Sequence, residues 1–273
     1  MSHASSNTTV ASRFELTQGL AAATILLAAG MLLATAGSAS AAVSYQEDFT
    51  IGGTVDGDFS DVGWFSRLTQ DGEIKDYDHS SGTGSRAAGV HAGSDYAYIA
   101  PKNRANVSNA PALVYTDEAS LGDISTLASV QFDVIGDNID VEYRVAVQVG
   151  GLWYASNEMF EDTRNNPGPP HTTGTYVARQ YMPAAFEAAA NWLTINNTTL
   201  GATSDIALGS APVSDLVGTV AAIGLYLDAG TNSETAGDHI RFDSFVVNVV
   251  PTPAALPTGL ALIGLLAIRR RSY

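Results

Sequence analysis

Carboxylates are the most abundant charged side chains in this sequence, and they are the first candidates for chemistry. The 273-residue chain carries 28 Asp and Glu residues against 13 Lys and Arg residues, a formal net charge of −15 at pH 7. Two carboxylates at a defined separation can hydrolyse a glycosidic bond, but among so many acids the spacing singles out no pair. An acidic surface repels phosphate backbones, so nucleic acid is not expected as a partner. Divalent cations are compatible with such a surface.

The last strand candidate before the C-terminal tail, HIRFDSFVVNVV, leads to a more specific hypothesis. Ile240 and Phe242 set one apolar phase, whereas Phe245 and Val247 set the opposite phase. A strand has a side-chain period of two, so this change predicts a β-bulge around Asp243 and Ser244. We expect the bulge to turn Asp243 inward, where an unpaired carboxylate is costly.

A calcium ion between the first and last strands would resolve that cost. Glu47 and Asp48, from the first strand, are the expected partners of Asp243, because first and last strands often pair in such folds. Calcium takes six to eight oxygen ligands in flexible geometry. The alternative is that Asp243 is hydrogen-bonded to backbone groups at the bulge. A second candidate calcium site is the stretch DGDFSD, although Arg67 stands where an EF-hand has its bidentate Glu; its carboxylates are Asp56, Asp58 and Asp61.

No other catalytic grouping stands out in the sequence. The chain has no cysteine, which excludes disulfides, thiolate metal sites and a Cys nucleophile. The histidines show no metal-ligand spacing, and no Ser lies in a GxSxG motif. Neither of the two lysines, Lys75 and Lys102, lies in a phosphate-binding glycine loop. We therefore expect a non-enzymatic protein; the alternative is a polysaccharide-acting hydrolase or lyase.

Aromatic side chains are candidates for contact with sugars, because exposed rings can stack on pyranose faces. Trp153 and Tyr154 follow Gly150-Gly151, a turn that would place them near a loop tip. We name Trp153 and Tyr154 as candidate glycan-binding residues, with burial in the core as the alternative. For Trp64 and Trp192 the surrounding sequence favours the core.

Alternating apolar and polar residues dominate the middle of the chain. In IDVEYRVAVQV (139–149) the apolar residues alternate with polar ones such as Glu142 and Arg144, which predicts a strand with one buried and one wet face. VQFDV (130–134) and AIGLYLD (222–228) alternate in the same way. Only 183–190 and 215–217 suggest helix. Many short strands separated by turn-rich pieces predict one all-β domain, an antiparallel β-sandwich of jelly-roll type, over residues 42–249.

The N-terminus has the features of a secretory signal peptide. Arg13 precedes an apolar run over residues 20–35, and small residues follow at Ala39 and Ala41. This pattern predicts a signal peptide over 1–41, cut by signal peptidase between Ala41 and Ala42. An uncleaved membrane anchor is the alternative.

The C-terminus has three consecutive parts: a proline motif, an apolar run and a basic cluster. The apolar run, 254–268, would span about 22 Å as a helix, which makes a short transmembrane segment. A basic cluster after such a segment stays on the cytoplasmic side. The residues of the outer two parts are Val250, Pro251, Thr252 and Pro253, then Arg269, Arg270 and Arg271.

This tripartite order resembles the PEP-CTERM sorting signal, with Thr252 where that family usually has Glu. The resemblance covers 250–273 and implies recognition by an exosortase, passage through the inner membrane, and delivery to the cell surface or extracellular matrix. It also implies an association with exopolysaccharide and biofilm formation. Leu256-Pro257-Thr258-Gly259 looks like a sortase signal but lacks the residue that such signals carry between Pro and Thr.

Overall fold

The computed structural model describes residues 41–52, 57–70, 72–76, 88–92, 95–99, 111–135, 141–162, 176–228 and 240–250. Residues 1–40 of the predicted signal peptide, including Ala39, lie outside these residues, and so does the sorting signal from Pro251 through the cluster Arg269–Arg271. Ala41, Ala42 and Val250 are described. No helix in the described ranges is long and apolar enough to cross a bilayer.

The described part of the chain is all-β, as the alternation predicts. Three short 3-10 helices, Phe59–Val62, Ile124–Thr126 and Ala189–Asn191, accompany the strands. The strands are β1 (Ala42–Glu47), β2 (Phe65–Gln70), β3 (Glu73–Asp76), β4 (Ala88–His91), β5 (Tyr96–Ile99), β6 (Ala112–Thr116), β7 (Leu127–Ile135), β8 (Val141–Val149), β9 (Leu152–Ser156), β10 (Phe160–Asp162), β11 (Val177–Tyr181), β12 (Trp192–Asn196), β13 (Ala207–Leu208), β14 (Val220–Asp228) and β15 (Ile240–Val249).

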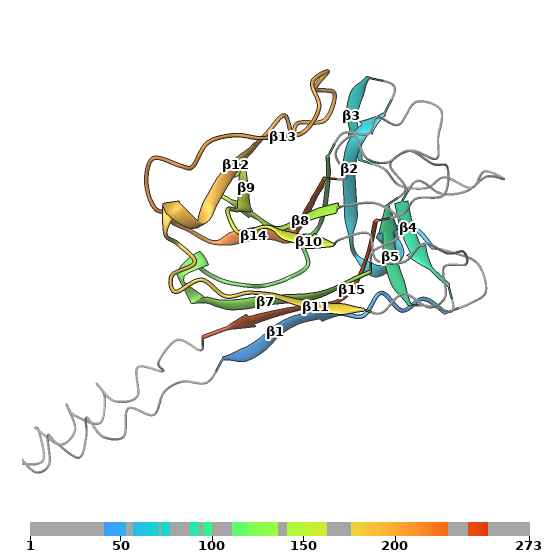
Figure 1. Ribbon diagram of the computed structural model, residues 1–273, viewed down its shortest axis with the longest axis horizontal. Coiled ribbons are helices and arrows are strands. Elements are labelled where there is room, and N and C mark those ends of the chain that lie inside the picture. The colour runs from blue at the N-terminus through green and yellow to red at the C-terminus, as the bar shows by residue number, and fades with distance from the viewer. Residues whose placement is uncertain are drawn as a thin grey trace, which may run out of the picture. The chain divides into compact units, whose positions relative to one another are not determined.

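The strands form two antiparallel sheets (Figure 1). The smaller sheet has the order β11-β7-β15-β5-β4, and β1 also pairs with β15. The larger sheet has the order β13-β12-β9-β8-β14-β6-β2-β3, and β10 pairs with β8. The chain passes repeatedly from one sheet to the other, for example from β6 to β7, from β7 to β8 and from β14 to β15. Strands that are distant in sequence therefore lie side by side.

The main core lies between the two sheets and follows the predicted alternation. On β8, Val141, Tyr143, Val145 and Val147 are buried in this core. Tyr143 also donates a hydrogen bond from its hydroxyl to the carbonyl oxygen of Arg241, 3.1 Å away on β15 in the other sheet. Trp64 and Trp192 are fully buried, which confirms their expected place in the core.

The predicted bulge in β15 is confirmed. The register between β15 and β7 shifts between Asp243 and Val246, and Ser244 has a left-handed φ of 50°. Phe242 and Phe245 are both fully buried although they are an odd number of residues apart. The predicted pairing of the first and last strands is also confirmed, because Ala42 lies opposite Val249 and Glu47 opposite Phe245.

The outer face of the larger sheet is less wet than the alternation predicts. A second apolar cluster packs there, and it includes Ala146 of β8, Ile74 of β3 and Ile206. The segment before β13 is held over this face because the N–H of Ile74 donates to the carbonyl of Ala202, at 2.8 Å. Here the segment before β13 covers the outer face of the larger sheet. The alternation in a single strand therefore does not show whether its outer face is exposed to water.

The two expected helical segments are not helices. Residues 183–190 form turns that lead into the 3-10 helix Ala189–Asn191, and 215–217 have no regular structure. The side chain of Asn191 donates to the carbonyl of Ala185, and the indole of Trp192 donates to the carbonyl of Phe186. These bonds occupy carbonyls that an α-helix would use, so tertiary packing overrides the helical tendency of the alanines.

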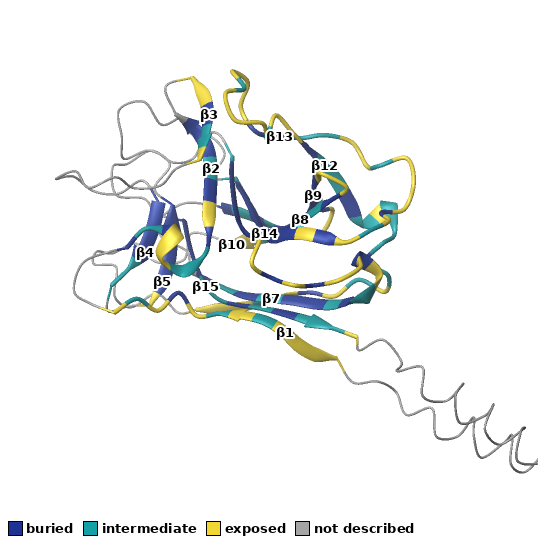
Figure 2. Cartoon of the chain, turned by 180° about the vertical axis from the view of Figure 1, so that it is seen from behind, coloured by how far each residue is buried: buried dark blue, intermediate teal, exposed yellow. Residues whose placement is uncertain are grey.

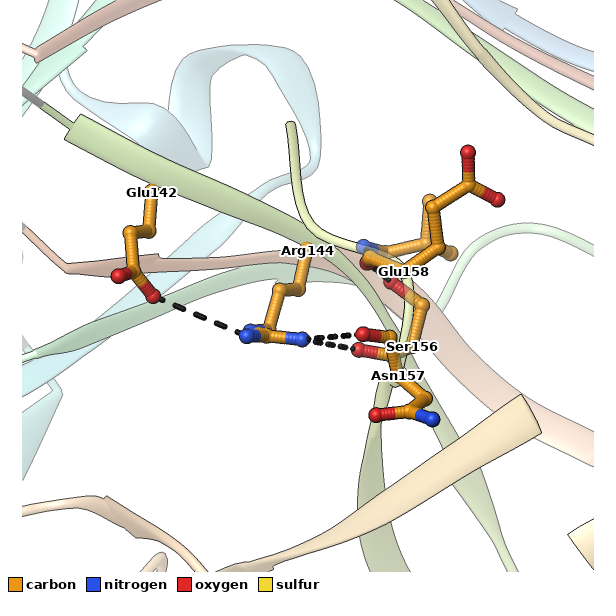
Figure 3. A network of polar contacts seen from close by, with 6 residues as sticks. Glu142, Arg144, Ser156, Asn157 and Glu158 are labelled. Carbon is orange, nitrogen blue, oxygen red and sulfur yellow. Dashed lines mark hydrogen bonds and ion pairs between the residues drawn. The ribbon is translucent and has the colours of Figure 1, made fainter. Parts of the chain in front are cut away.

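Arg144 lies on the outer face of β8, but it is not a simple solvent-exposed residue (Figure 3). Its guanidinium donates to the carbonyls of Ser156, at 2.9 Å, and Asn157, at 2.7 Å. It also lies 3.8 Å from the carboxylate of Glu142. The Ser156 hydroxyl accepts from the N–H of Val145 and donates to the carbonyl of Glu158. Arg144 therefore fixes the path of the chain where β9 ends.

We expect Val145→Asp to prevent folding and Arg144→Ser to destabilise the domain by about 1–3 kcal/mol. The first change buries an unpaired carboxylate in the main core, and the second leaves two backbone carbonyls without their charged donor. Urea denaturation followed by tryptophan fluorescence measures both. Gln148→Ser, on the same outer face of β8, is the control and should cost little; equal effects of Arg144→Ser and Gln148→Ser would contradict the role of Arg144.

Candidate functional site

A groove lies beside the hairpin that joins β8 to β9. Gly150 and Gly151 make the two-residue turn with φ values of 60° and 80°, a conformation that glycine adopts without steric cost. The hollow has a volume of about 440 Å³. Its lining residues are Val149, Gly150, Leu152, Tyr154, Thr194, Ser210, Ala211, Pro212, Val213, Ser214, Asp215, Leu216 and Val217.

The connection between β13 and β14 forms one wall of this groove, and much of it is exposed (Figure 2). It begins as an extension of the β12–β13 pair, because the N–H of Thr194 donates to the carbonyl of Ser210 at 3.0 Å. Near its other end it is bonded to the connection between β11 and β12, where the N–H of Leu216 donates to the carbonyl of Glu187 at 2.8 Å. The carboxylate of Asp215 accepts the N–H of Ala189 at 2.9 Å. The wall is therefore fixed at both ends.

The lining of the groove is largely uncharged. Its lining combines hydroxyl groups of Thr194, Ser210 and Ser214 with exposed aliphatic side chains. Asp215 is the one carboxylate among the lining residues, and one of its oxygens is bonded to the backbone. Glycoside hydrolysis with the usual acid and base needs two carboxylates. The groove suits an uncharged ligand that offers both hydroxyl groups and apolar surface.

Of the two predicted glycan-binding residues, one lies in the groove and the other does not. Tyr154 lines the groove, although its side chain is mostly buried against the main core. Trp153 points to the opposite face of β9 and is 3% exposed. Its ring packs edge-on against Tyr115 at a centroid distance of 4.9 Å. The expectation of an exposed indole at the loop tip is wrong, because alternation along β9 turns Trp153 into the second apolar cluster.

The groove wall from Ser210 to Val217 was missed by sequence reasoning. Residues such as Pro212 and Val213 follow no period, so nothing local marks them as part of a site. The side chains of Val213 and Val217 are 105% and 84% exposed. The sequence itself shows only two valines within five residues, in a stretch without strand alternation. If a loop is expected there, these valines are the one signal of an exposed apolar surface.

The three proposed calcium ligands lie near one end of the bulged strand. A carboxylate oxygen of Asp243 accepts the N–H of Ser244 at 2.7 Å, which is the backbone alternative expected for this residue. Glu47 accepts the N–H of Phe49 at 2.7 Å, and Asp48 accepts the side-chain amide of Gln46 at 3.1 Å. Each carboxylate is therefore bonded within two residues of its own position.

Electrostatics at this place are unfavourable to ionised carboxylates. Burial raises the pKa of Asp243 to about 6, and the nearby charges of Asp133, Asp48 and Asp95 add to the shift, while the N–H of Ser244 opposes it. Asp133 on β7 lies directly opposite Asp243 in the register. Burial also raises the pKa of Glu47. Like charges opposite one another destabilise a pair of strands.

A metal ion could relieve this repulsion, but the geometry is incomplete. Within the described residues, no three Asp, Glu or His side chains are arranged so that they could hold one. In the second candidate stretch, Asp61 accepts the N–H of Asp58 at 2.8 Å and caps the 3-10 helix Phe59–Val62. Asp56 lies outside the described residues. The calcium site stays a prediction.

No family model, curated protein or solved structure matches this chain.

We expect Asp243→Asn to stabilise the domain at pH 7–8, and this gain to shrink as the pH falls through about 6. The folded pKa lies above the unfolded one, so the folded state binds the proton more tightly, and wild-type stability is lost as Asp243 ionises. Asp133, Asp48 and Asp95 act electrostatically on this group, and Asp243 in turn acts on Tyr176. All four side chains are present in both proteins, so the comparison isolates the change at Asp243.

Urea denaturation of both proteins between pH 4 and pH 8, in buffer with a chelator, measures this effect. Asp205→Asn, at an exposed position, is the matched Asp→Asn control, measured at the same pH values. A gain for Asp243→Asn that is equal at pH 4 and pH 8 would contradict the assignment. Calcium in place of the chelator should raise the wild-type melting temperature and leave Asp243→Asn unchanged, if the predicted ion binds.

Proposed function

We propose that this protein is exported, sorted by an exosortase-type system and displayed at the cell surface or in the extracellular matrix. In this proposal it is a non-enzymatic jelly-roll domain that contacts exopolysaccharide. Signal peptidase and the exosortase are its processing partners, and the inner membrane holds it before processing. The order of strands, the position of the two chain ends and the groove each support one part of the proposal.

The strand order supports the jelly roll. Four strands of the smaller sheet follow the order β1-β15-β7-β11, and four of the larger sheet follow β6-β14-β8-β9. In chain order these eight strands pass between the sheets as two interleaved Greek keys do. Strands β2 to β5 then form one insertion, and β12 and β13 another.

The observation that carries the sorting proposal is that all described strands lie between the two predicted processing sites, and that the first strand pairs with the last. Ala42, directly after the predicted signal cut, lies opposite Val249 in the β1–β15 pair. The N–H of Val250, the first residue of the proline motif, donates to the carbonyl of Thr126 at 2.8 Å. Cuts before Ala42 and after Val250 would remove no strand. Ala42 and Val249 are paired, so the first and last strands begin and end at the same end of the described domain. This arrangement supports attachment to a membrane from one end.

The groove supports contact with a polysaccharide. Its lining is almost uncharged in a chain with a net charge of −15, and it offers hydroxyl groups beside Tyr154. Neutral sugars have the same mixture of hydroxyl groups and apolar ring faces, and such ligands bind in clefts with a few placed polar groups. The groove is open to solvent along the wall that includes Ser214 and Val217. A long polysaccharide could therefore enter the groove from the side, without its end having to be inserted first.

We expect mass spectrometry of the surface fraction to find a mature protein that starts at Ala42 and ends within Pro251–Pro253. Two variants serve as controls. Ala41→Leu should leave the signal peptide attached, because the peptidase needs a small residue there. Replacement of Arg269–Arg271 by Gln should leave the tail attached. A wild-type surface protein that retains Arg269–Arg271 would reduce the tail to a plain anchor.

We expect chain 42–250 to bind neutral polysaccharide fragments on a glycan array, and Ala211→Trp to weaken this binding about tenfold or more, which corresponds to about 1.4 kcal/mol. The added indole fills the groove. Ser204→Trp, exposed and outside the groove, is the matched control and should bind as the wild type does. Equal binding by both variants would remove the groove from the proposal, and release of reducing sugar by the wild type would favour the hydrolase or lyase.

A further inference from the structure

Three aliphatic side chains around the groove are exposed far more than such residues usually are. Leu152, at the β8–β9 turn, is 62% exposed, Val213 is 105% exposed and Val217 is 84% exposed. We call these three residues the aliphatic rim. All three line the same hollow. Single exposed apolar residues need no explanation, but several that gather at one feature mark a contact surface.

A short chain of hydrogen bonds connects this rim to the place where the chain leaves the domain. Val217 is followed by Gly218, whose carbonyl accepts the N–H of Ile124 at 3.0 Å. Two residues further along, the carbonyl of Thr126 accepts the N–H of Val250 at 2.8 Å. The rim therefore lies at the end of the domain from which the C-terminal segment departs. In Figure 1 the connection between β13 and β14 lies on the same side as the free ends of β1 and β15.

The same end carries two further exposed valines. Val43 of β1 is 60% exposed and Val250 is 42% exposed. They lie close together because Val43 is opposite Asn248 in the β1–β15 pair. Five of the large exposed apolar side chains among the described residues thus belong to one end of the domain.

The length of the link limits how far this end can lie from the apolar tail segment. Only Pro251, Thr252 and Pro253 separate Val250 from Ala254, where the apolar run begins. Four residue steps reach at most about 14 Å, even when fully extended. If the apolar run lies in a bilayer, as the proposed function requires, the Val250 end of the domain is held against the surface of that bilayer. A lipid surface is then the partner that the exposed valines and leucine meet.

We propose that the aliphatic rim rests in the lipid interface while the tail is in the membrane, and that removal of the tail uncovers the groove. This inference rests on the proposed function. A few aliphatic side chains do not hold a protein on a bilayer alone, because stable attachment needs a second signal. The tail provides that signal by raising the effective concentration of the rim at the surface. Contact with lipid therefore ends when the tail is cut, and the groove becomes accessible to matrix polymer only in the processed protein.

The absence of cysteine from the sequence makes a direct test straightforward. Chains 42–273, which lack the predicted signal peptide and keep the tail, are made with the single changes Val213→Cys or Val217→Cys, labelled with an environment-sensitive fluorophore and reconstituted into vesicles of phosphatidylcholine and phosphatidylethanolamine. Leu200→Cys is the matched control: Leu200 is also an exposed aliphatic residue, at 50%, but it lies beside Gly201, which is bonded to Ile74 of β3. Flotation of the vesicles is measured in the same samples and reports whether the tail inserts.

In floated samples we expect the label at 213 or 217 to shift to the blue, to lose quenching by aqueous iodide and to gain quenching by nitroxide lipids. The label at 200 should show none of these changes, and chain 42–250 should neither float nor shield any label. Protein that floats with its labels at 213 and 217 exposed to water would overturn this inference alone. Protein that does not float would overturn the membrane-held intermediate as well. Shielding in chain 42–250 that increases with protein concentration would assign the rim to a second copy of the chain and would also overturn the inference.

Discussion

The bulge at Asp243 and Ser244 is the constraint on which the smaller sheet depends. β15 pairs with β5 before the bulge, with β1 after it, and with β7 on its other edge along both halves. A regular strand would have to turn either Phe242 or Phe245 toward solvent, because its side chains alternate. The extra residue inverts the phase, so that both rings enter the core. Phe242 meets Phe49 at 5.1 Å and Phe245 meets Trp64 at 5.0 Å between ring centroids.

The bulge also explains why charge accumulates on the outer face of this sheet. It places Asp243 directly opposite Asp133, where the carboxylate is half-buried and its pKa is raised to about 6. The N–H of Ser244 offsets part of the cost. The bulge thus brings both rings into the core and also places two acids opposite each other, which is unfavourable. The stability of the sheet therefore depends on pH in the range where Asp243 titrates.

The position of the chain ends connects the fold to the proposed function. β1 and β15 pair over most of their length, from Ala42 opposite Val249 to Glu47 opposite Phe245. The proposed cuts on either side of this pair would therefore remove none of the core residues. The same pairing places the groove and its aliphatic rim at the end that the tail would hold near a membrane. In the proposed function, a single topological feature, the pairing of first and last strands, would link cleavage, membrane attachment and access to the groove.

The sequence by itself determined the all-β class, the alternation of β8 and the bulge in β15, because side-chain period and phase are local properties of a strand. It also determined the burial of Trp64 and Trp192, which lie in apolar surroundings. Only the tertiary structure decided what covers the outer face of the larger sheet, so that Trp153 is buried there in the second apolar cluster, while Tyr154 lines the groove. The partners of Arg144, the wall from Ser210 to Val217 and the opposition of Asp133 to Asp243 were likewise decided by contacts between segments far apart in the chain. Such contacts depend on strand order and register, which a local pattern does not specify.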